Sequence, residues 1–261
     1  MSSGESSSQL RNVLENRADV LRYLVETPST KPELVTALSA ARSTIDRAVR
    51  DLEAVDCLTK RDGQYHATPT GQVALTEYDR YVAATDSMKH TSTFINSLPE
   101  DAPLDVALLH DADFFLAESH APEAALAGSI DVFERATVLR GLAPVVLAFY
   151  PRLIADRVAS GDLTVEIVAQ ENVVDSLSDL PTESVDRFVA NDAVTIYATE
   201  EQLPYALWLM ETPEGTDAGI TAYEEGGVRG VLMNDSDTAV TWAKAQYDQY
   251  RERAQLVAEF D

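Results

Sequence analysis

The stretch that decides the fold is "ARSTIDRAVRDLEAVDCLTKRDGQYHATPTG", residues 41–71. Its first part, about residues 42–55, predicts an amphipathic helix, because apolar side chains recur every three or four positions and the arginines fall on the other face. The segment "CLTKRDGQYHA" that follows predicts a strand, an Asp-Gly turn and a second strand, since this dipeptide favours a two-residue hairpin turn. A short helix followed directly by a hairpin is therefore expected.

Two more helices are predicted before this stretch. The segment "QLRNVLENRADVLRYLVE" has helical apolar spacing and should end near Pro28, which cannot continue a helix. The next helix should begin at once, because Thr30 and Glu33 fit a capping box with Pro32 in the first turn. Helix, helix-turn-helix and hairpin in this order predict a winged helix-turn-helix over residues 9–70. Residues 1–8, which lack the pattern of a secretory signal, are expected to form a disordered tail.

The residues "RSTIDRAVRDLEAVDCLTKRDGQYHATPTG" resemble the recognition helix and wing of archaeal winged-helix transcriptional regulators. The likeness extends to the end of the wing, at Tyr65, Thr68 and Gly71. Asp56 departs from the pattern, because many relatives have glycine there as the helix stop. In a winged helix the third helix enters the major groove, where Arg, Ser and Thr side chains reach base edges or phosphates. The alternative is a solvated helix face with ordinary charges. The residues expected to contact DNA are Arg42, Ser43, Thr44, Arg47, Arg50, Lys60, Arg61 and Gln64.

Residues 71–98 predict one long helix with a heptad-like stripe that includes Tyr78, Tyr81 and Met88. Two interpretations remain open: a connector helix that forms a homodimer, or a helix that packs on its own second domain.

The pattern changes at residue 99, where short β-rich runs alternate with helical stretches up to residue 261. Such alternation predicts an α/β domain. The fold class expected for the whole chain is thus α+β / α/β, with a winged helix-turn-helix, a connector helix and an α/β domain. The runs expected to be strands are "LDVALLH", "ATVLRG", "LTVEIVAQ", "AVTIYAT", "YALWLME" and "VRGVLMND", with a hairpin turn at Gly226-Gly227 and a last helix over about 236–258.

Residues 99–258 resemble the α/β sensor domain that lies behind winged helices in haloarchaeal regulators and is shared with a regulator of methanogenesis. The likeness rests on "ERATVLRGLAPVV", "SGDLTVEIVAQENVVDSL" and "GGVRGVLMNDSDTAVTWAKAQYDQYR". It implies a ligand sensor, in some relatives for carbohydrates or phosphorylated intermediates, and hence a link to sugar metabolism.

Ligands of open α/β sheets bind beyond the carboxyl ends of the strands. Arginines at such ends would suit an anionic effector such as a sugar phosphate. The alternative is that these arginines pair with the surface carboxylates that surround them. The residues expected to bind the ligand are His110, Arg140, Gln170 and Thr199 at strand ends, Arg152 at a helix start and Arg229 in the late hairpin.

The chain is strongly acidic, with 44 Asp and Glu against 20 Lys and Arg and a net charge of −24. Residues 1–98 hold 11 basic and 13 acidic side chains, whereas residues 99–261 hold 9 and 31, which suggests different partners for the two parts. Few lysines and many carboxylates resemble the proteins of salt-loving archaea, although an acidic mesophilic protein has a similar composition. The acidic part could alternatively contact another protein.

Sequence motifs give no support to an enzyme. The chain has no G-x-S-x-G, P-loop, G-x-G-x-x-G or H-E-x-x-H motif. The segment "HDADFFLAESH" matches no metal-ligand spacing, and Cys57, the single cysteine, is expected in the core. No apolar run approaches the roughly 18 residues of a membrane span. The sequence therefore predicts a cytoplasmic, homodimeric transcriptional regulator that binds promoter DNA and a small effector, with no cofactor, metal or membrane partner.

Overall fold

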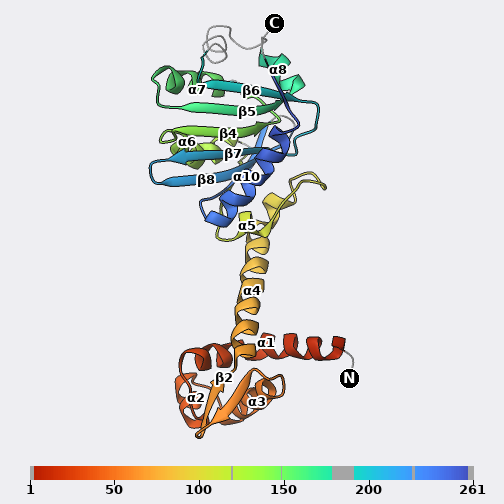
Figure 1. The fold of residues 1–261 in the computed structure, drawn as a ribbon, viewed down its shortest axis with the longest axis vertical. Coiled ribbons are helices and arrows are strands. Elements are labelled where there is room, and N and C mark those ends of the chain that lie inside the picture. The colour runs from red at the N-terminus through yellow and green to blue at the C-terminus, as the bar shows by residue number, and fades with distance from the viewer. Residues whose placement is uncertain (1–2, 119, 148, 178–190, 225–226, 258–261) are drawn as a thin grey trace. The chain divides into compact units, whose positions relative to one another are not determined.

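The computed structural model describes residues 3–118, 120–147, 149–177, 191–224 and 227–257 (Figure 1). Two compact units divide the chain after Thr85, within the long helix α4 (Pro69–Ile95). No helix among the described residues is long and apolar enough to cross a membrane.

The first unit is the predicted winged helix-turn-helix. Its elements follow the expected order: α1 (Ser3–Glu26), α2 (Lys31–Ala37), α3 (Arg42–Glu53), β1 (Leu58–Arg61), β2 (Gln64–Ala67) and the start of α4. Helix α1 begins at Ser3, so the expected disordered tail over residues 1–8 is wrong for residues 3–8. Once a helix is nucleated, each added residue gains a backbone hydrogen bond, and α1 therefore extends beyond its packed part.

Helix α2 begins with the predicted capping box. The Thr30 backbone N–H and hydroxyl both donate to Glu33 Oε2, at 2.7 and 2.8 Å. These hydrogen bonds favour the charged carboxylate and lower the pKa of Glu33.

Helix α3 buries the side chains that its periodicity predicted: Ile45, Ala48, Val49 and Leu52. It ends at Glu53, two residues before the predicted limit. Asp56 then takes φ 58°, in the left-handed region that favours glycine and that Asp tolerates better than most residues. The departure from the glycine pattern therefore falls on a backbone position that does need positive φ.

A close contact joins the end of α3 to the start of α4. The Thr68 hydroxyl donates to the Asp56 carbonyl at 2.6 Å and accepts the Gly71 N–H at 3.0 Å, so Thr68 caps α4. A Cβ on Gly71 would lie 2.3 Å from the Cys57 carbonyl oxygen. Cys57 itself is fully buried, and burial together with the charge of Asp56 raises its thiol pKa. The Thr-x-x-Gly pattern is thus a packing requirement.

The wing is a two-residue hairpin, with Leu58 opposite Ala67 and Arg61 opposite Gln64. Its turn residues Asp62 and Gly63 have φ of 49° and 84°, as a tight hairpin requires. This turn reverses the chain, so that β2 pairs antiparallel with β1.

The second unit contains an eight-stranded mixed sheet in the order β10-β6-β5-β4-β7-β8-β9-β3. Only β4, β5 and β6 are parallel to one another, and the other pairings are antiparallel. The strand bounds are β3 Asp113–Leu116, β4 Val138–Ala143, β5 Thr164–Gln170, β6 Val194–Thr199, β7 Ala206–Thr212, β8 Gly215–Glu224, β9 Gly227–Asn234 and β10 Gln255–Leu256.

Helices cover both faces of this sheet. The 3₁₀ helix η1 (Pro122–Leu126), α6 (Ala127–Phe133) and α7 (Tyr150–Ala159) pack on one face, around Val165, Ile196 and Trp208. The opposite face packs against α5 (Val106–Leu109), α10 (Asp237–Arg251) and the end of α4. Helix α8 (Glu171–Leu177) follows β5 directly and precedes β6 in the chain. The two apolar cores of this unit are therefore separated by the sheet.

Two sequence predictions for this unit are wrong. The run "LDVALLH" forms helix α5, which the Asp105 carboxylate caps by accepting the Ala107 N–H at 2.8 Å and whose end Asn234 holds by donating to the Leu108 and His110 carbonyls. The last helix ends at Arg251, and β10 follows where helix was expected; residue 258 and Gly226 lie outside the described residues. The other five predicted strands are confirmed as β4, β5, β6, β7 and β9.

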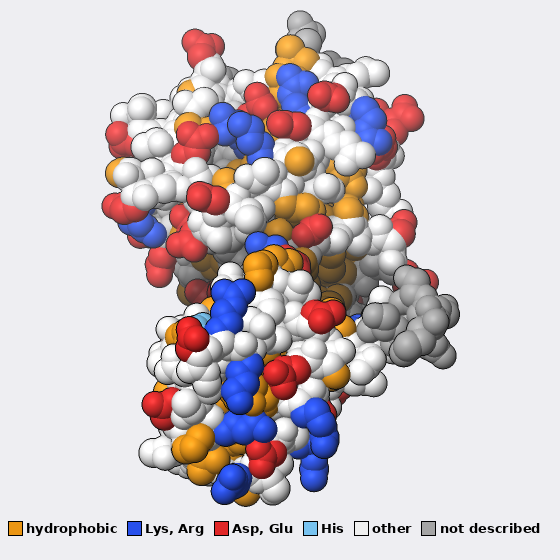
Figure 2. Space-filling view, turned by 60° about the horizontal axis from the view of Figure 1, so that its bottom comes forward, with side chains coloured by type: hydrophobic (Ala, Val, Ile, Leu, Met, Phe, Trp, Pro, Cys, Tyr) orange, Lys and Arg blue, Asp and Glu red, His pale blue; other side chains and the backbone are white. Residues whose placement is uncertain are grey.

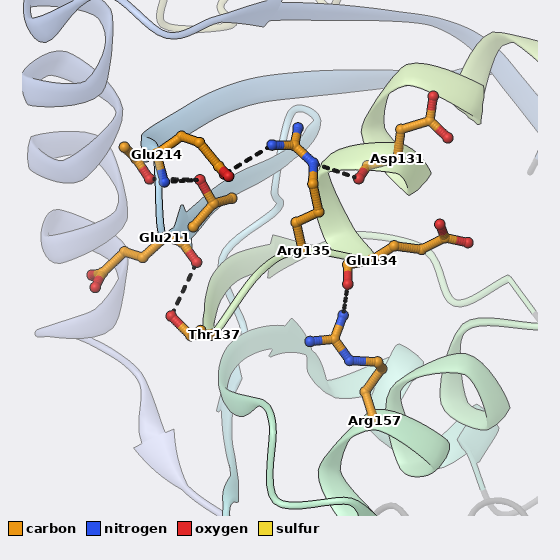
Figure 3. Close-up of polar contacts among 9 residues, drawn as sticks. Asp131, Glu134, Arg135, Thr137, Arg157, Glu211 and Glu214 are labelled. Carbon is orange, nitrogen blue, oxygen red and sulfur yellow. Dashed lines mark hydrogen bonds and ion pairs between the residues drawn. The ribbon is translucent and has the colours of Figure 1, made fainter.

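Arg157 of α7 closes the end of α6. Its guanidinium donates to the carbonyls of Phe133 at 2.8 Å and Ala136 at 2.7 Å. It also donates to the Glu134 carbonyl (Figure 3). Carbonyls at a helix end have no partner within the helix, so a cation there supplies both donors and favourable charge. Arg135 pairs nearby with Glu214 at 3.0 Å (Figure 3).

We expect Gly71→Ala to lower the free energy of unfolding of the first unit by about 1–3 kcal/mol, because the added methyl group meets a backbone carbonyl that cannot move aside. Gly215→Ala is the control, since a Cβ there meets nothing within 4 Å. Thermal unfolding of both variants checks this, and equal melting temperatures would contradict the packing role of Gly71.

We expect Arg157→Ala to cost about 2 kcal/mol of stability, since charged hydrogen bonds to three carbonyls are lost. Arg152→Ala removes an exposed arginine from the same helix and should change stability little. Chemical denaturation of the two variants makes the comparison. A loss of equal size in both would show that α7 needs only positive charge.

Candidate nucleic-acid interface and ligand cavity

The outward face of α3 carries the predicted DNA-contacting side chains. Arg42, Ser43, Thr44, Arg47 and Arg50 are all exposed, whereas Ile45, Ala48, Val49 and Leu52 of the same helix are buried. The wing presents Lys60 and Arg61 as exposed side chains and Gln64 as half-buried. The first unit therefore displays all eight candidate residues at its surface.

The carboxylates nearest to this face are held in ion pairs. Lys31 Nζ lies 2.8 Å from Asp46 Oδ1, which links α2 to α3. The hydrogen bond between them lowers the pKa of Asp46 and raises that of Lys31. Arg17 donates to Asp51 Oδ2 through Nε and Nη2, at 3.2 and 3.1 Å. Both acidic side chains are thus neutralised from inside the unit.

The arginines between them are not neutralised in this way. Among the described residues, no carboxylate lies within 4 Å of the charged groups of Arg42, Arg47, Lys60 or Arg61. Arg50 has one long contact, 3.7 Å to Asp51, and its side chain is 73% exposed. Figure 2 shows Lys and Arg side chains gathered on the part of the first unit that the view brings forward. This face can offer guanidinium donors to an external anion or base edge.

The predicted ligand residues of the second unit do not converge. His110 follows α5 and is exposed beside Asp111, so it does not end a strand. Arg140 lies within β4, three residues before its end, and pairs with Glu211 of β7 at 2.6 Å. This hydrogen bond raises the pKa of Arg140. Arg140 faces the α10 side of the sheet, together with Glu166 and Tyr247.

Gln170 and Thr199 are the one pair that the structure brings together, as partners at the carboxyl ends of β5 and β6. Both side chains already serve the following turn: Gln170 accepts the Leu203 N–H at 3.4 Å, and Thr199 accepts the Glu201 N–H at 3.1 Å. Arg152 is exposed on α7, and Arg229 is exposed on β9, 3.6 Å from Glu224. The six residues therefore form no common site in this structure.

A cavity of about 140 Å³ does lie in the second unit, on the sheet face covered by α6 and α7. It reaches Ala143 and Ala169, near the carboxyl ends of β4 and β5, where such folds place ligands. Trp208 forms part of its wall, and a Cβ on Gly219 would come within 2.2 Å of the Trp208 ring. None of the six predicted ligand residues lines it.

The polar atoms of this cavity are hydroxyls that the sequence analysis did not single out. Tyr150, Thr221 and Tyr223 line it, and no hydrogen bond joins their hydroxyls to a described residue. Burial raises the pKa of Tyr150 to about 12 and that of Tyr223 further, so both are neutral donors. Strand alternation could have assigned Thr221 and Tyr223 to one face, because Ala218, Ile220 and Ala222 face the other core.

Among the described residues, no group of three His, Cys, Asp or Glu side chains is arranged to hold a metal ion. The segment around His110 and His120 contributes only the paired contacts His110–Asp111 and His120–Glu118.

The solved structures that resemble this chain are distant. TrmBL2, an archaeal chromatin protein, is 12% identical over 93% of this chain and 92% of that chain, with a TM-score of 0.43. Nuc from Salmonella typhimurium, a phospholipase D family member, is 11% identical over 57% and 100%, with a TM-score of 0.39. NucT from Helicobacter pylori is 14% identical over 56% and 99%, also with a TM-score of 0.39. These values are too low to carry a functional argument, and no curated protein matches the chain.

Two family models match. The HVO_A0261 N-terminal domain covers residues 7–90, which include the winged helix and most of α4. The middle domain of the methanogenesis regulatory protein FilR1 covers residues 122–253, half of the chain and most of its sheet. The chain therefore belongs to the FilR1 middle-domain family of regulatory proteins, with an HVO_A0261-type N-terminal domain in front of that domain.

Proposed function

We propose that this protein is a DNA-binding transcriptional regulator whose helix α3 enters the major groove. The observation that carries the proposal is the exposed arginine face of α3, where Arg42 and Arg47 have no ion pair with a described residue, in a chain of net charge −24. Lys31 and Arg17 bind the nearby carboxylates of Asp46 and Asp51, which reduces the negative charge beside Arg42 and Arg47. Membership of a family of regulatory proteins supports the same function.

The candidate residues divide by role. Arg42, Ser43, Thr44 and Arg47, in the first turns of α3, suit base edges, since arginine can contact guanine with two hydrogen bonds. Arg50, Lys60, Arg61 and Gln64 suit the phosphate backbone. Each phosphate contact weakens as the salt concentration rises. An acidic protein that works in salt-rich surroundings is therefore expected to make few such contacts.

We also propose that the protein acts as a homodimer, with α4 as part of the connector. Val73 and Tyr81 of α4 are 65% and 66% exposed, which is unusual for large apolar side chains. They border a groove with Leu10 and Leu14 of α1. A second copy placed there would bury these side chains and present two recognition helices to paired half-sites.

The second unit is proposed to sense an effector and not to catalyse a reaction. The expected anionic ligand, such as a sugar phosphate, has no converging arginine site here, so that proposal rests on the resemblance alone. The acidic surface supports the alternative of a protein partner, because 31 of the 44 carboxylates fall in residues 99–261.

We expect Arg42→Ala and Arg47→Ala each to weaken binding to the DNA upstream of the protein's own gene by roughly tenfold or more, the loss typical of a base contact. Lys60→Ala and Arg61→Ala should weaken binding to every sequence alike and lower the salt dependence by about one phosphate contact each. Electrophoretic mobility shift and footprinting over a range of potassium chloride concentrations measure both effects.

The control for these variants is Arg80→Ala, which removes the same charge from an exposed residue of α4 that pairs with Glu77. Wild-type affinity in this control together with loss in the α3 variants supports the interface. Unchanged occupancy for Arg42→Ala and Arg47→Ala would refute it.

We expect the double variant Val73→Ser, Tyr81→Ser to shift the protein toward a monomer, because the apolar groove loses its exposed rim. Gln72→Ser changes an exposed polar neighbour on the same helix and should leave the mass unchanged. Sedimentation velocity in molar potassium chloride distinguishes the two. A wild-type protein that is already monomeric would rule out the dimer.

A further inference from the structure

Among the described residues, no charged side chain lines the cavity under α6 and α7. Its lining is apolar apart from a few hydroxyls, and it includes Leu139, Ile154, Ile167, Ile196 and Met210. An ionised ligand placed there would lose its hydration without gaining a counter-ion, which is strongly unfavourable. Two arginines near the sheet already have other partners. Arg140 pairs with Glu211 on the opposite face of the sheet, and Arg157 caps α6.

Three hydroxyls in this cavity have no hydrogen bond to another described residue. Thr221 is only 2% exposed, yet its hydroxyl has no hydrogen bond to a described residue, and the same holds for Tyr150 and Tyr223. The lining residue Ser129, by contrast, donates to the Leu126 carbonyl at 2.8 Å. None of these oxygens is a fully buried atom without a partner, so each keeps access to the space of the cavity. The three groups are therefore free to hydrogen bond with a molecule inside it.

The size of the cavity limits what can enter. An apolar cavity of about 150 Å³ accepts a benzene-sized molecule, and this one measures about 140 Å³. A molecule of roughly six to ten non-hydrogen atoms therefore fits, with at most one or two oxygens directed at the hydroxyls.

We propose that this cavity is the effector site of the second unit and that it binds an uncharged, mainly apolar small molecule with a hydrogen-bonding oxygen. This ligand class deepens the sensor role proposed above and rests on it, but binding to the cavity can be measured without DNA. It also replaces the anionic metabolite expected from the strand-end arginines with a neutral one.

The test uses the full chain and three probes in isothermal titration calorimetry. Benzyl alcohol carries an apolar ring and one hydroxyl, benzoate has the same ring with a charge, and glucose 6-phosphate represents the anionic sugar class. We expect saturable binding of benzyl alcohol, and binding of benzoate and glucose 6-phosphate at least tenfold weaker. Tighter binding of either anion, or no binding of benzyl alcohol at millimolar concentration, would overturn the proposal.

Variants locate the binding. Tyr150→Phe with Tyr223→Phe removes two hydroxyls and keeps the apolar walls, so affinity for benzyl alcohol should fall about tenfold while that for toluene stays within a factor of two. Tyr197→Phe is the control, because Tyr197 lies on the α10 face, under Arg251. Ala143→Phe should abolish binding of both probes by filling the cavity.

The outcomes separate the two proposals. Equal loss of benzyl alcohol and toluene in the double phenylalanine variant, or full binding by a folded Ala143→Phe protein, would place the probes outside this cavity. Circular dichroism establishes that each variant is folded, and the double variant decides the question if Ala143→Phe does not fold. DNA binding by the wild-type protein without a probe tests the regulator function independently.

Discussion

The contact between Gly71 and the Cys57 carbonyl is the constraint on which the first unit depends. It brings the start of α4 against the residues that follow α3, where only a hydrogen atom fits. Thr68 closes the same junction by bonding to the Asp56 carbonyl and the Gly71 N–H. Recognition helix, wing and connector therefore meet in one short segment, residues 56–71. The start of α4 is thus packed directly against the residues that join α3 to the wing.

The two units use their basic side chains in different ways. In the first unit Lys31 and Arg17 pair with Asp46 and Asp51, while Arg42 and Arg47 have no ion pair with any residue that the structure describes. In the second unit two arginines make contacts within the fold. Arg157 closes the end of α6, and Arg140 crosses from β4 to Glu211 on β7. The same residue type is thus exposed without a described ion-pair partner at Arg42 and Arg47 of the first unit, and makes internal contacts at Arg140 and Arg157 of the second.

The α3 surface could be predicted from the sequence and the cavity could not, because their residues are brought together in different ways. The α3 surface depends on local spacing: a helix of period 3.6 fixes which residues face outward once Ile45, Ala48 and Val49 are buried. The cavity depends on which strands become neighbours. Tyr150 and Tyr223 are far apart in sequence and line one space only because β4, β7 and β8 are adjacent. The expectation that Arg140 ends a strand failed because β4 continues to Ala143 and turns Arg140 to the opposite face.

The sequence by itself determined the order of elements in the first unit, its caps, its hairpin turn and the five strands that carry strong β patterns, since each of these follows from contacts within a few residues. Only the tertiary structure decided that "LDVALLH" becomes helix α5, with Asn234 donating to the Leu108 and His110 carbonyls from across the fold. It also decided the mixed strand order, the short edge strands β3 and β10, and the position of the cavity. These features depend on long-range pairing, in which the free energy of burial and of satisfied backbone groups outweighs local preference.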